Sequence, residues 1–125
     1  MSKNIYASMR YHDARAAIGW LERAFGFECR VAYDGADGTV GHAELRYGAG
    51  VVMLGNWRGE DDHRRPGEGW AYVAVEDLGA HHRQAVQAGA EIVDGPQTQD
   101  YGRFYSARDP EGNLWSFGTY DPADG

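Results

Sequence analysis

The hydrophobic positions of this chain change their period several times, and each change indicates a structural element. Residues 4–11 are predicted to form a strand, and residues 14–25 carry apolar side chains three and four positions apart, which is typical of an amphipathic helix. Asp13 precedes this run and can cap the helix, and Gly26 follows it and can end it. A strand followed by a helix therefore opens the chain.

Three further strands are predicted after this helix, separated by glycine-rich turns. They span residues 27–33, 39–47 and 51–54. A polar, glycine-rich segment, residues 58–69, then interrupts the pattern close to the middle of the chain. Its composition is typical of a linker.

The same order of elements recurs after this segment. The second half is predicted to contain a strand at 70–75, a helix at 78–88, a short strand at 91–93 and a hairpin over 101–120. The two helix caps, Asp13 and Asp77, are 64 residues apart, and the two glycines that end the helices, Gly26 and Gly89, are 63 apart. Two copies at so long a period favour a duplicated module over a solenoid.

Two breaks shape the strands of the second half. Gly95-Pro96 is predicted to end the short strand at 91–93. In the hairpin, Pro110 presets the backbone at the second turn position, and Gly112 supplies a left-handed residue. Asp109 can accept a hydrogen bond from the backbone of that turn.

The repeated order predicts an α+β fold, with two tandem βαβββ modules in a single domain of residues 1–125. We expect module 1 at about residues 4–57, the linker at 58–69, and module 2 at about 70–120. Each module buries one sheet face against its helix. The two remaining faces, curved together, would enclose a cavity.

Charge and composition exclude several classes of partner. The chain has 12 Lys and Arg against 19 Asp and Glu, a formal net charge of −7, so we expect no nucleic acid partner. No apolar run approaches the ~20 residues that span a bilayer, so we expect no membrane partner. Residues 1–4 lack a signal-peptide core, which favours a cytoplasmic protein. Cys29 is the one cysteine, so an internal disulfide is excluded, and its apolar neighbours favour a packing role.

Several short motifs, in order and at their spacing, resemble one known family. They are residues 9–14, 25–27, 72–78, 88–92 and 109–115. With them, the chain resembles the vicinal oxygen chelate superfamily, in its glyoxalase and bleomycin-resistance branch. The resemblance implies paired βαβββ modules, a cupped mixed sheet and, usually, a homodimer.

The resemblance also implies four positions where metal-using members carry ligands, two in each module. Here they are occupied by Tyr6, Met53, Trp70 and Ser116. None of these side chains is a competent ligand for a catalytic divalent ion, and a shift of one residue would offer only Ala71 or Phe117. We therefore expect the fold without the metal site, and no cofactor.

His42 and Glu44 are the remaining candidates for catalytic chemistry. They are two residues apart on a predicted strand, so their side chains share one face. Such a pair can bind a metal or transfer protons, or can belong to the polar face of a strand. The lack of a further ligand nearby favours the polar face.

Aromatic and arginine side chains favour a ligand-binding surface. By the family register, we expect the ligand to contact Tyr6, Ser8, Arg10, Met53, Trp57, Trp70, Tyr72, Arg103, Tyr105 and Ser116. Rings would stack on a planar or aromatic ligand, and arginines would orient an anionic group. Tyr6, Trp70 and Tyr72 equally fit a core role, which is the role expected of Trp20, Trp115 and Phe117.

The sequence thus favours a metal-independent protein that binds a small planar or aromatic molecule over an enzyme. Antibiotics are among the candidate ligands. The alternative is a glyoxalase-like lyase, an isomerase or a dioxygenase-type enzyme that acts on a small carbonyl or aromatic compound, with Glu44 or His42 as the base. The charge of the ligand stays open, because the acidic chain would attract a cation whereas the arginines suit an anion.

Overall fold

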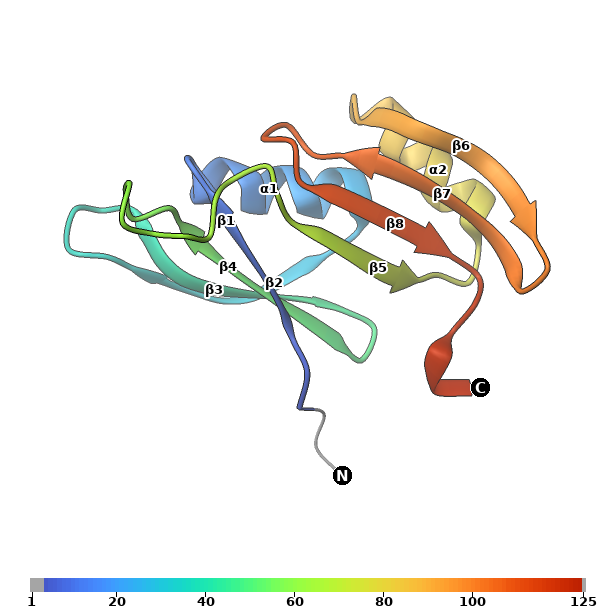
Figure 1. The fold of residues 1–125 in the computed structure, drawn as a ribbon, viewed down its shortest axis with the longest axis horizontal. Helices are drawn as coiled ribbons and strands as arrows, with labels where there is room; N and C mark the ends of the chain where they lie inside the picture. Colours follow the sequence, from blue (N-terminus) through green and yellow to red (C-terminus); the bar gives the residue numbers. More distant parts are fainter. Residues whose placement is uncertain (1–3, 125) are drawn as a thin grey trace.

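A computed structural model describes residues 4–124. Met1 to Lys3, on which the signal-peptide prediction partly rests, lie outside the described residues. It has the two predicted βαβββ modules (Figure 1). Module 1 contains β1 (Ala7–Tyr11), α1 (Ala14–Phe25), β2 (Glu28–Asp34), β3 (Val40–Tyr47) and β4 (Gly50–Asn56). Module 2 contains β5 (Trp70–Ala74), α2 (Leu78–Gln87), β6 (Glu91–Gln99), β7 (Gly102–Arg108) and β8 (Leu114–Gly118), followed by the 3-10 helix η1 (Pro122–Asp124).

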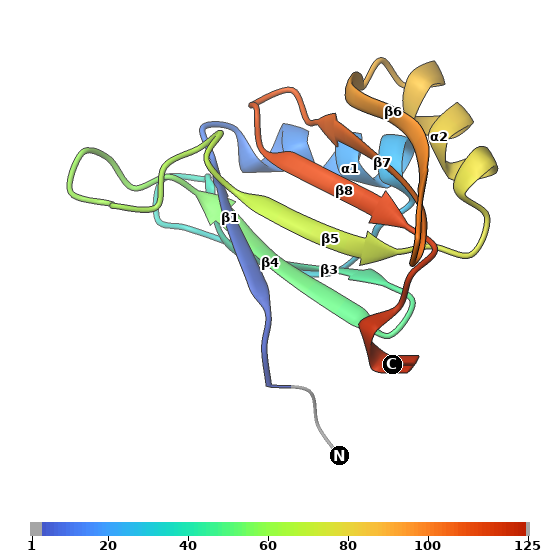
Figure 2. The same ribbon diagram turned by 45° about the vertical axis from the view of Figure 1, so that its right-hand side comes forward.

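Each module forms its own four-stranded mixed sheet. The strand orders are β1-β4-β3-β2 and β5-β8-β7-β6, and the pairs β1–β4 and β5–β8 are parallel. The two sheets lie side by side with the helices on one side of them (Figures 1 and 2). No helix within residues 4–124 is long and apolar enough to cross a membrane.

Alternation along the strands separates a helix-covered face from an open face in each sheet. On β1, Met9 and Tyr11 are buried, whereas Ser8 is exposed and Arg10 is half-buried. On β5, Trp70 and Tyr72 are exposed. The residues on the open faces are therefore available to a ligand or a partner.

Aromatic side chains join the two modules on the helix-covered side. Phe25, at the end of α1, lies 4.7 Å from Phe117 between ring centroids, and Phe27 lies 5.2 Å from Trp115. Trp115 and Phe117 are fully buried, as the core prediction requires, and Trp20 packs against the core while partly exposed. The hydrophobic core is thus shared between the modules.

The predicted helix caps are confirmed. The side chain of Asp13 accepts a hydrogen bond from Ala16 N at 3.1 Å, and that of Asp77 accepts one from Ala80 N at 3.0 Å. Gly26 ends α1 in the left-handed conformation, with φ of 78°. Local sequence signals therefore set both helix starts and the end of α1.

The turn between β7 and β8 also forms as predicted, and it reaches into module 1. Gly112 has a φ of 95°, and Asp109 Oδ1 accepts hydrogen bonds from the backbone of Glu111 and Asn113, both at 3.1 Å. The Glu111 carboxylate accepts from the backbone N–H groups of His12 at 2.6 Å and Asp13 at 2.8 Å. Module 2 thereby caps the start of α1.

One predicted break is wrong. The strand predicted at 91–93 continues as β6 to Gln99, through Gly95 and Pro96. β6 is the edge strand of its sheet, so the lack of an N–H group on Pro96 need not remove a hydrogen bond between strands. The pairing of β6 with β7 shifts register between Asp94 and Gln97. Gly95-Pro96 therefore causes a register shift within β6 and does not end the strand.

Candidate functional site

The residues predicted to contact a ligand fall on several surfaces rather than one. Tyr6, Ser8, Arg10 and Met53 belong to the open face of module 1 or its margin, and Trp70, Tyr72 and Ser116 to that of module 2. Trp57 follows β4 at the edge of module 1. The last two, Arg103 and Tyr105, lie elsewhere, as described below.

The open face of module 2 presents a fixed indole. Trp70 is 70% exposed, yet its Nε1 donates a hydrogen bond to Ser116 Oγ at 3.0 Å. Ser116 Oγ lies 2.8 Å from Ser106 Oγ on the neighbouring strand. Tyr72 is 40% exposed, and its hydroxyl donates to the Tyr120 carbonyl at 2.6 Å. Both rings are thus oriented by hydrogen bonds while they remain available for stacking.

The open face of module 1 carries an arginine. Ser8 is the register partner of Met53 across the parallel pair β1–β4, and Arg10 is the partner of Gly55. Tyr6, 44% exposed, lies two residues before Ser8. A small side chain thus lies between an aromatic and a cationic one along a single strand.

Arg103 and Tyr105 share one face of β7, but this is the helix-covered face. Tyr105 is fully buried, and its hydroxyl lies 2.6 Å from Nδ1 of His81 on α2. The prediction that Tyr105 lines an open ligand surface is therefore not supported by its position. Arg103 is exposed at the start of β7, where its backbone N–H donates to Thr119 Oγ1 at 3.0 Å.

The four positions implied for metal ligands do not form a metal site. The side chain of Ser116 is engaged by Trp70 and Ser106, an indole N–H can only donate, and a thioether and a phenol complete the set. Within residues 4–124, no group of three His, Cys, Asp or Glu side chains is placed to hold a metal ion. The donor set therefore does not fit a catalytic divalent ion.

His42 and Glu44 do share the open face of module 1. Nε2 of His42 lies 3.0 Å from Glu44 Oε2, and Nε of Arg30 lies 3.6 Å from Glu44 Oε1. Glu44 is also the register partner of Met53. This arrangement gives Glu44 two cationic or donor neighbours, which suits a polar strand face and leaves the carboxylate already occupied.

A cleft lies between the modules and is lined by residues of both. Its volume is about 1080 Å³, and Tyr6 and Tyr72 are the predicted ligand residues that line it. Its charged lining residues are all acidic: Glu76, Asp77, Asp121 and Asp124. The remaining predicted residues lie outside this cleft, so one chain does not gather the whole set in one cavity.

Cys29 has the environment of a packing residue. It is partly buried on β2, its thiol contacts the Val31 carbonyl at 3.5 Å, and burial raises the pKa of the thiol. A raised pKa leaves less thiolate at neutral pH, which disfavours a nucleophilic role.

Comparison with known proteins settles the family. The model of the glyoxalase/bleomycin resistance protein/dioxygenase superfamily matches residues 5–117. The chain belongs to this superfamily. Solved structures also share its fold. TioX from Micromonospora sp. ML1 has a TM-score of 0.79 and 31% identity, over 96% of this chain and 100% of that one.

Two further proteins are similar to this chain. TnmS3 of Streptomyces sp. CB03234, described as an antibiotic binding protein, has a TM-score of 0.75 and 19% identity, over 94% of this chain and 97% of that one. An uncharacterised protein of Mycobacterium bovis is 29% identical over 136 residues, which covers 94% of this chain and 86% of the relative.

Proposed function

We propose that this protein binds a planar or aromatic small molecule without a metal ion. The observation that carries the proposal is the indole of Trp70, which is fixed by Ser116 at a position where metal-using relatives would carry a ligand, and is 70% exposed. A large aromatic ring that is held in one orientation and left in water offers apolar surface that a stacked ligand would bury with a gain in free energy.

Two further observations support the proposal. Tyr72 and Tyr6 are also exposed rings on or beside the open faces, so several stacking surfaces are available. TnmS3, which has the same fold, is described as an antibiotic binding protein. We therefore propose small antibiotic-like aromatic compounds as a ligand class.

We also propose that the protein acts as a homodimer. Most of the proposed ligand residues of one chain lie on its two open faces, and of the whole set only Tyr6 and Tyr72 line the cleft between the modules. A second chain that brings the open face of its module 2 to that of module 1 would enclose a site. Sedimentation velocity should give twice the chain mass of 13.8 kDa. A monomer at the concentrations used for ligand binding would contradict the proposed homodimer. The ligand would then have to bind to an open face of a single chain.

Tryptophan fluorescence tests the binding proposal. Planar compounds should quench the emission of the native protein at sub-millimolar concentration, and Trp70→Ala should weaken binding about fivefold, corresponding to ~1 kcal/mol of stacking. Trp20→Phe is the matched control, because Trp20 lies at the helix-covered side. No quenching by any compound of a broad panel, or equal binding by the Trp70 variant, would contradict the proposal.

The enzyme alternative has one supporting observation, the 3.0 Å contact between His42 and Glu44 on an open face. It requires either a metal or a base at this pair. Elemental analysis together with titration of Zn²⁺, Ni²⁺ and Mn²⁺ separates the two functions. One tightly held ion per subunit would contradict metal-independent binding and favour the enzyme.

A further inference from the structure

The segment between β4 and β5 is folded over the end of β1, although its composition is that of a linker. Trp57 N donates to the Tyr11 carbonyl at 2.8 Å, and Trp57 Nε1 donates to the carbonyl of Asp62 at 3.0 Å. Further along, Asn113 of the β7–β8 turn accepts from the backbone N–H groups of Gly67 and Gly69. Both ends of the segment are therefore held in place.

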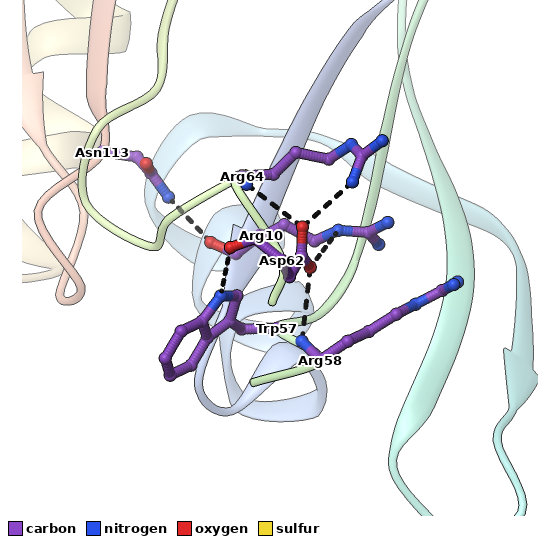
Figure 3. Close-up of polar contacts among 6 residues, drawn as sticks. All are labelled: Arg10, Trp57, Arg58, Asp62, Arg64 and Asn113. Carbon is purple, nitrogen blue, oxygen red and sulfur yellow. Dashed lines mark hydrogen bonds and ion pairs between the residues drawn. The ribbon is translucent and has the colours of Figure 1, made fainter. Parts of the chain in front are cut away.

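Asp62 organises this segment from within (Figure 3). Its side chain is only 3% exposed, and its Oδ1 accepts from both the backbone N and Nη1 of Arg64, at 3.1 and 3.0 Å. Its Oδ2 accepts from Arg58 N at 3.3 Å and lies 3.5 Å from Arg10 Nε. The backbone N–H of Arg64 is the main cause that lowers the pKa of Asp62, so the carboxylate is ionised at neutral pH.

Positive charge exceeds negative charge at this place. Three arginines, Arg10, Arg58 and Arg64, surround the single carboxylate of Asp62, and their guanidinium groups extend to the same side of it (Figure 3). We call these three residues the arginine cluster. The other carboxylates of the segment, Glu60, Asp61 and Glu68, form no ion pair with it in the part of the chain that the structure describes.

The arginine cluster has unused hydrogen-bonding capacity. The Arg58 side chain has no hydrogen bond or ion pair among the described residues, and Arg10 Nε is buried without a hydrogen-bond partner, its contact with Asp62 being an ion pair. Burial, together with the nearby charges of Arg58 and Arg64, lowers the pKa of Arg10. Three arginines around one carboxylate leave positive charge uncompensated, which is unfavourable and indicates that an anion completes the cluster.

The neighbouring strand leaves space for Arg10. Gly55 is its register partner on β4, and a Cβ atom there would lie 2.9 Å from Nη1 of Arg10. Any side chain at residue 55 would therefore displace the guanidinium. The backbone of β4 approaches closely enough that the guanidinium lies over it, on the open face.

The spacing between Tyr6 and the arginine cluster suits a planar ligand that carries an anionic group. Tyr6, Ser8 and Arg10 follow one another at two-residue steps, which are roughly 7 Å each along a strand. A fused two-ring system lying over Ser8 and Met53 would reach from Tyr6 towards Arg10. Its anionic substituent would then face the cluster.

We infer that Arg10, Arg58 and Arg64 bind an oxyanion group, such as a carboxylate, of the planar ligand. The inference rests on the proposed function and specifies the charge of its ligand. Guanidinium groups match the geometry of an oxyanion with two N–H donors each, and partial burial strengthens such bonds. The acidic cleft between the modules disfavours the same group, so the anion selects the open face of module 1.

Matched aromatic probes test this assignment. In calorimetric titrations, naphthalene-2-carboxylate should bind about tenfold more tightly than naphthalene-2-carboxamide, because only the former carries charge. Arg58→Ala should weaken carboxylate binding roughly threefold to tenfold and leave carboxamide binding within about twofold. This variant keeps the backbone bond from residue 58 to Asp62. Arg65→Ala, which removes the same charge from the same segment beside Trp57, is the control and should match the native protein.

Equal binding of the two probes, or equal effects of the Arg58 and Arg65 variants, would overturn the inference while the proposed function stands. Sodium sulfate tests the cluster without any aromatic ring. At constant ionic strength, sulfate should shift the Arg10 and Arg58 Nε–Hε resonances in nitrogen-proton NMR spectra, and chloride should not. If sulfate does not shift these resonances, the inference is overturned whatever the aromatic probes do. If sulfate shifts them but neither naphthalene probe binds, the result counts against the proposed function.

Discussion

At the scale of single residues, the buried side chain of Asp109 connects the two modules. Its Oδ1 accepts from two backbone N–H groups of its own turn, and its Oδ2 accepts from the Tyr11 hydroxyl at 2.6 Å and Trp115 Nε1 at 3.0 Å. One buried carboxylate thus satisfies four donors from both modules. Its negative charge and the burial of the phenol together raise the pKa of Tyr11.

Asp109→Asn should destabilise the protein by about 2–4 kcal/mol, because an amide has one accepting oxygen and would present an N–H₂ group to donors. Urea denaturation followed by circular dichroism measures the change. Asp100→Asn, in the exposed turn before β7, is the control and should change the free energy of unfolding by less than about 0.5 kcal/mol. Equal stability of the two variants would contradict the role of Asp109.

At the scale of elements, α1 depends on module 2 at both ends. Glu111 accepts from backbone N–H groups at its start, and at its end Gln84 Nε2 donates to the Arg23 carbonyl at 2.8 Å. A carboxylate at the N-terminus and donors at the C-terminus also complement the helix dipole. The corresponding turn of module 1, between β3 and β4, is the short Gly48-Ala49 connection.

Glu111→Ala should lower the free energy of unfolding by about 1–2 kcal/mol, since two N–H groups at the start of α1 lose their acceptor. The measurement is a urea titration at neutral pH. Glu91→Ala removes an exposed carboxylate at the start of β6 and serves as the comparison. Indistinguishable midpoints for the two variants would show that the contact adds nothing to stability.

Local sequence signals predicted the helices, strands and turns better than they predicted which face of a strand is buried. Asp13, Asp77 and Gly112 act through bonds within a few residues, so the sequence was sufficient to place them. Tyr105 was assigned to the wrong surface because Phe104 and Tyr105 are adjacent aromatics, and alternation alone cannot decide which one faces the helix.

The arginine cluster could be predicted only in part. Arg10 was a candidate because of its strand position, whereas Arg58 and Arg64 lie in a segment without periodicity. Their association depends on Asp62, which pairs with Arg10 on β1, and on the folding of the segment, which Asn113 of a turn distant in sequence holds at Gly67 and Gly69. Long-range contacts of this kind leave no local pattern in a sequence.

At the scale of the whole molecule, His81 links the two modules. Its Nε2 donates to the Phe25 carbonyl at 2.8 Å, which requires the hydrogen on that nitrogen, so Nδ1 accepts from the Tyr105 hydroxyl. Burial lowers the pKa of His81 below its ordinary value of 6.5. The histidine is therefore neutral in the folded protein at neutral pH.

Because the unfolded chain binds this proton more readily, the stability from neutral His81 is complete above about pH 6.5 and is lost as pH falls towards the lower folded pKa. His81→Gln should be less stable than the native protein at pH 7.5, and should lose less stability between pH 7.5 and 5.5. Urea titrations at both pH values measure this. His82→Gln should keep the native pH dependence, and an unchanged pH dependence in the His81 variant would contradict the prediction.

The placement of the β7–β8 turn has a consequence for biosynthesis. Residues 109–113, which complete the start of α1, are synthesised long after that helix. During translation, the first half therefore emerges from the ribosome before its stabilising partner has been made. The helix that is made first acquires its full set of native contacts only once this later turn has emerged.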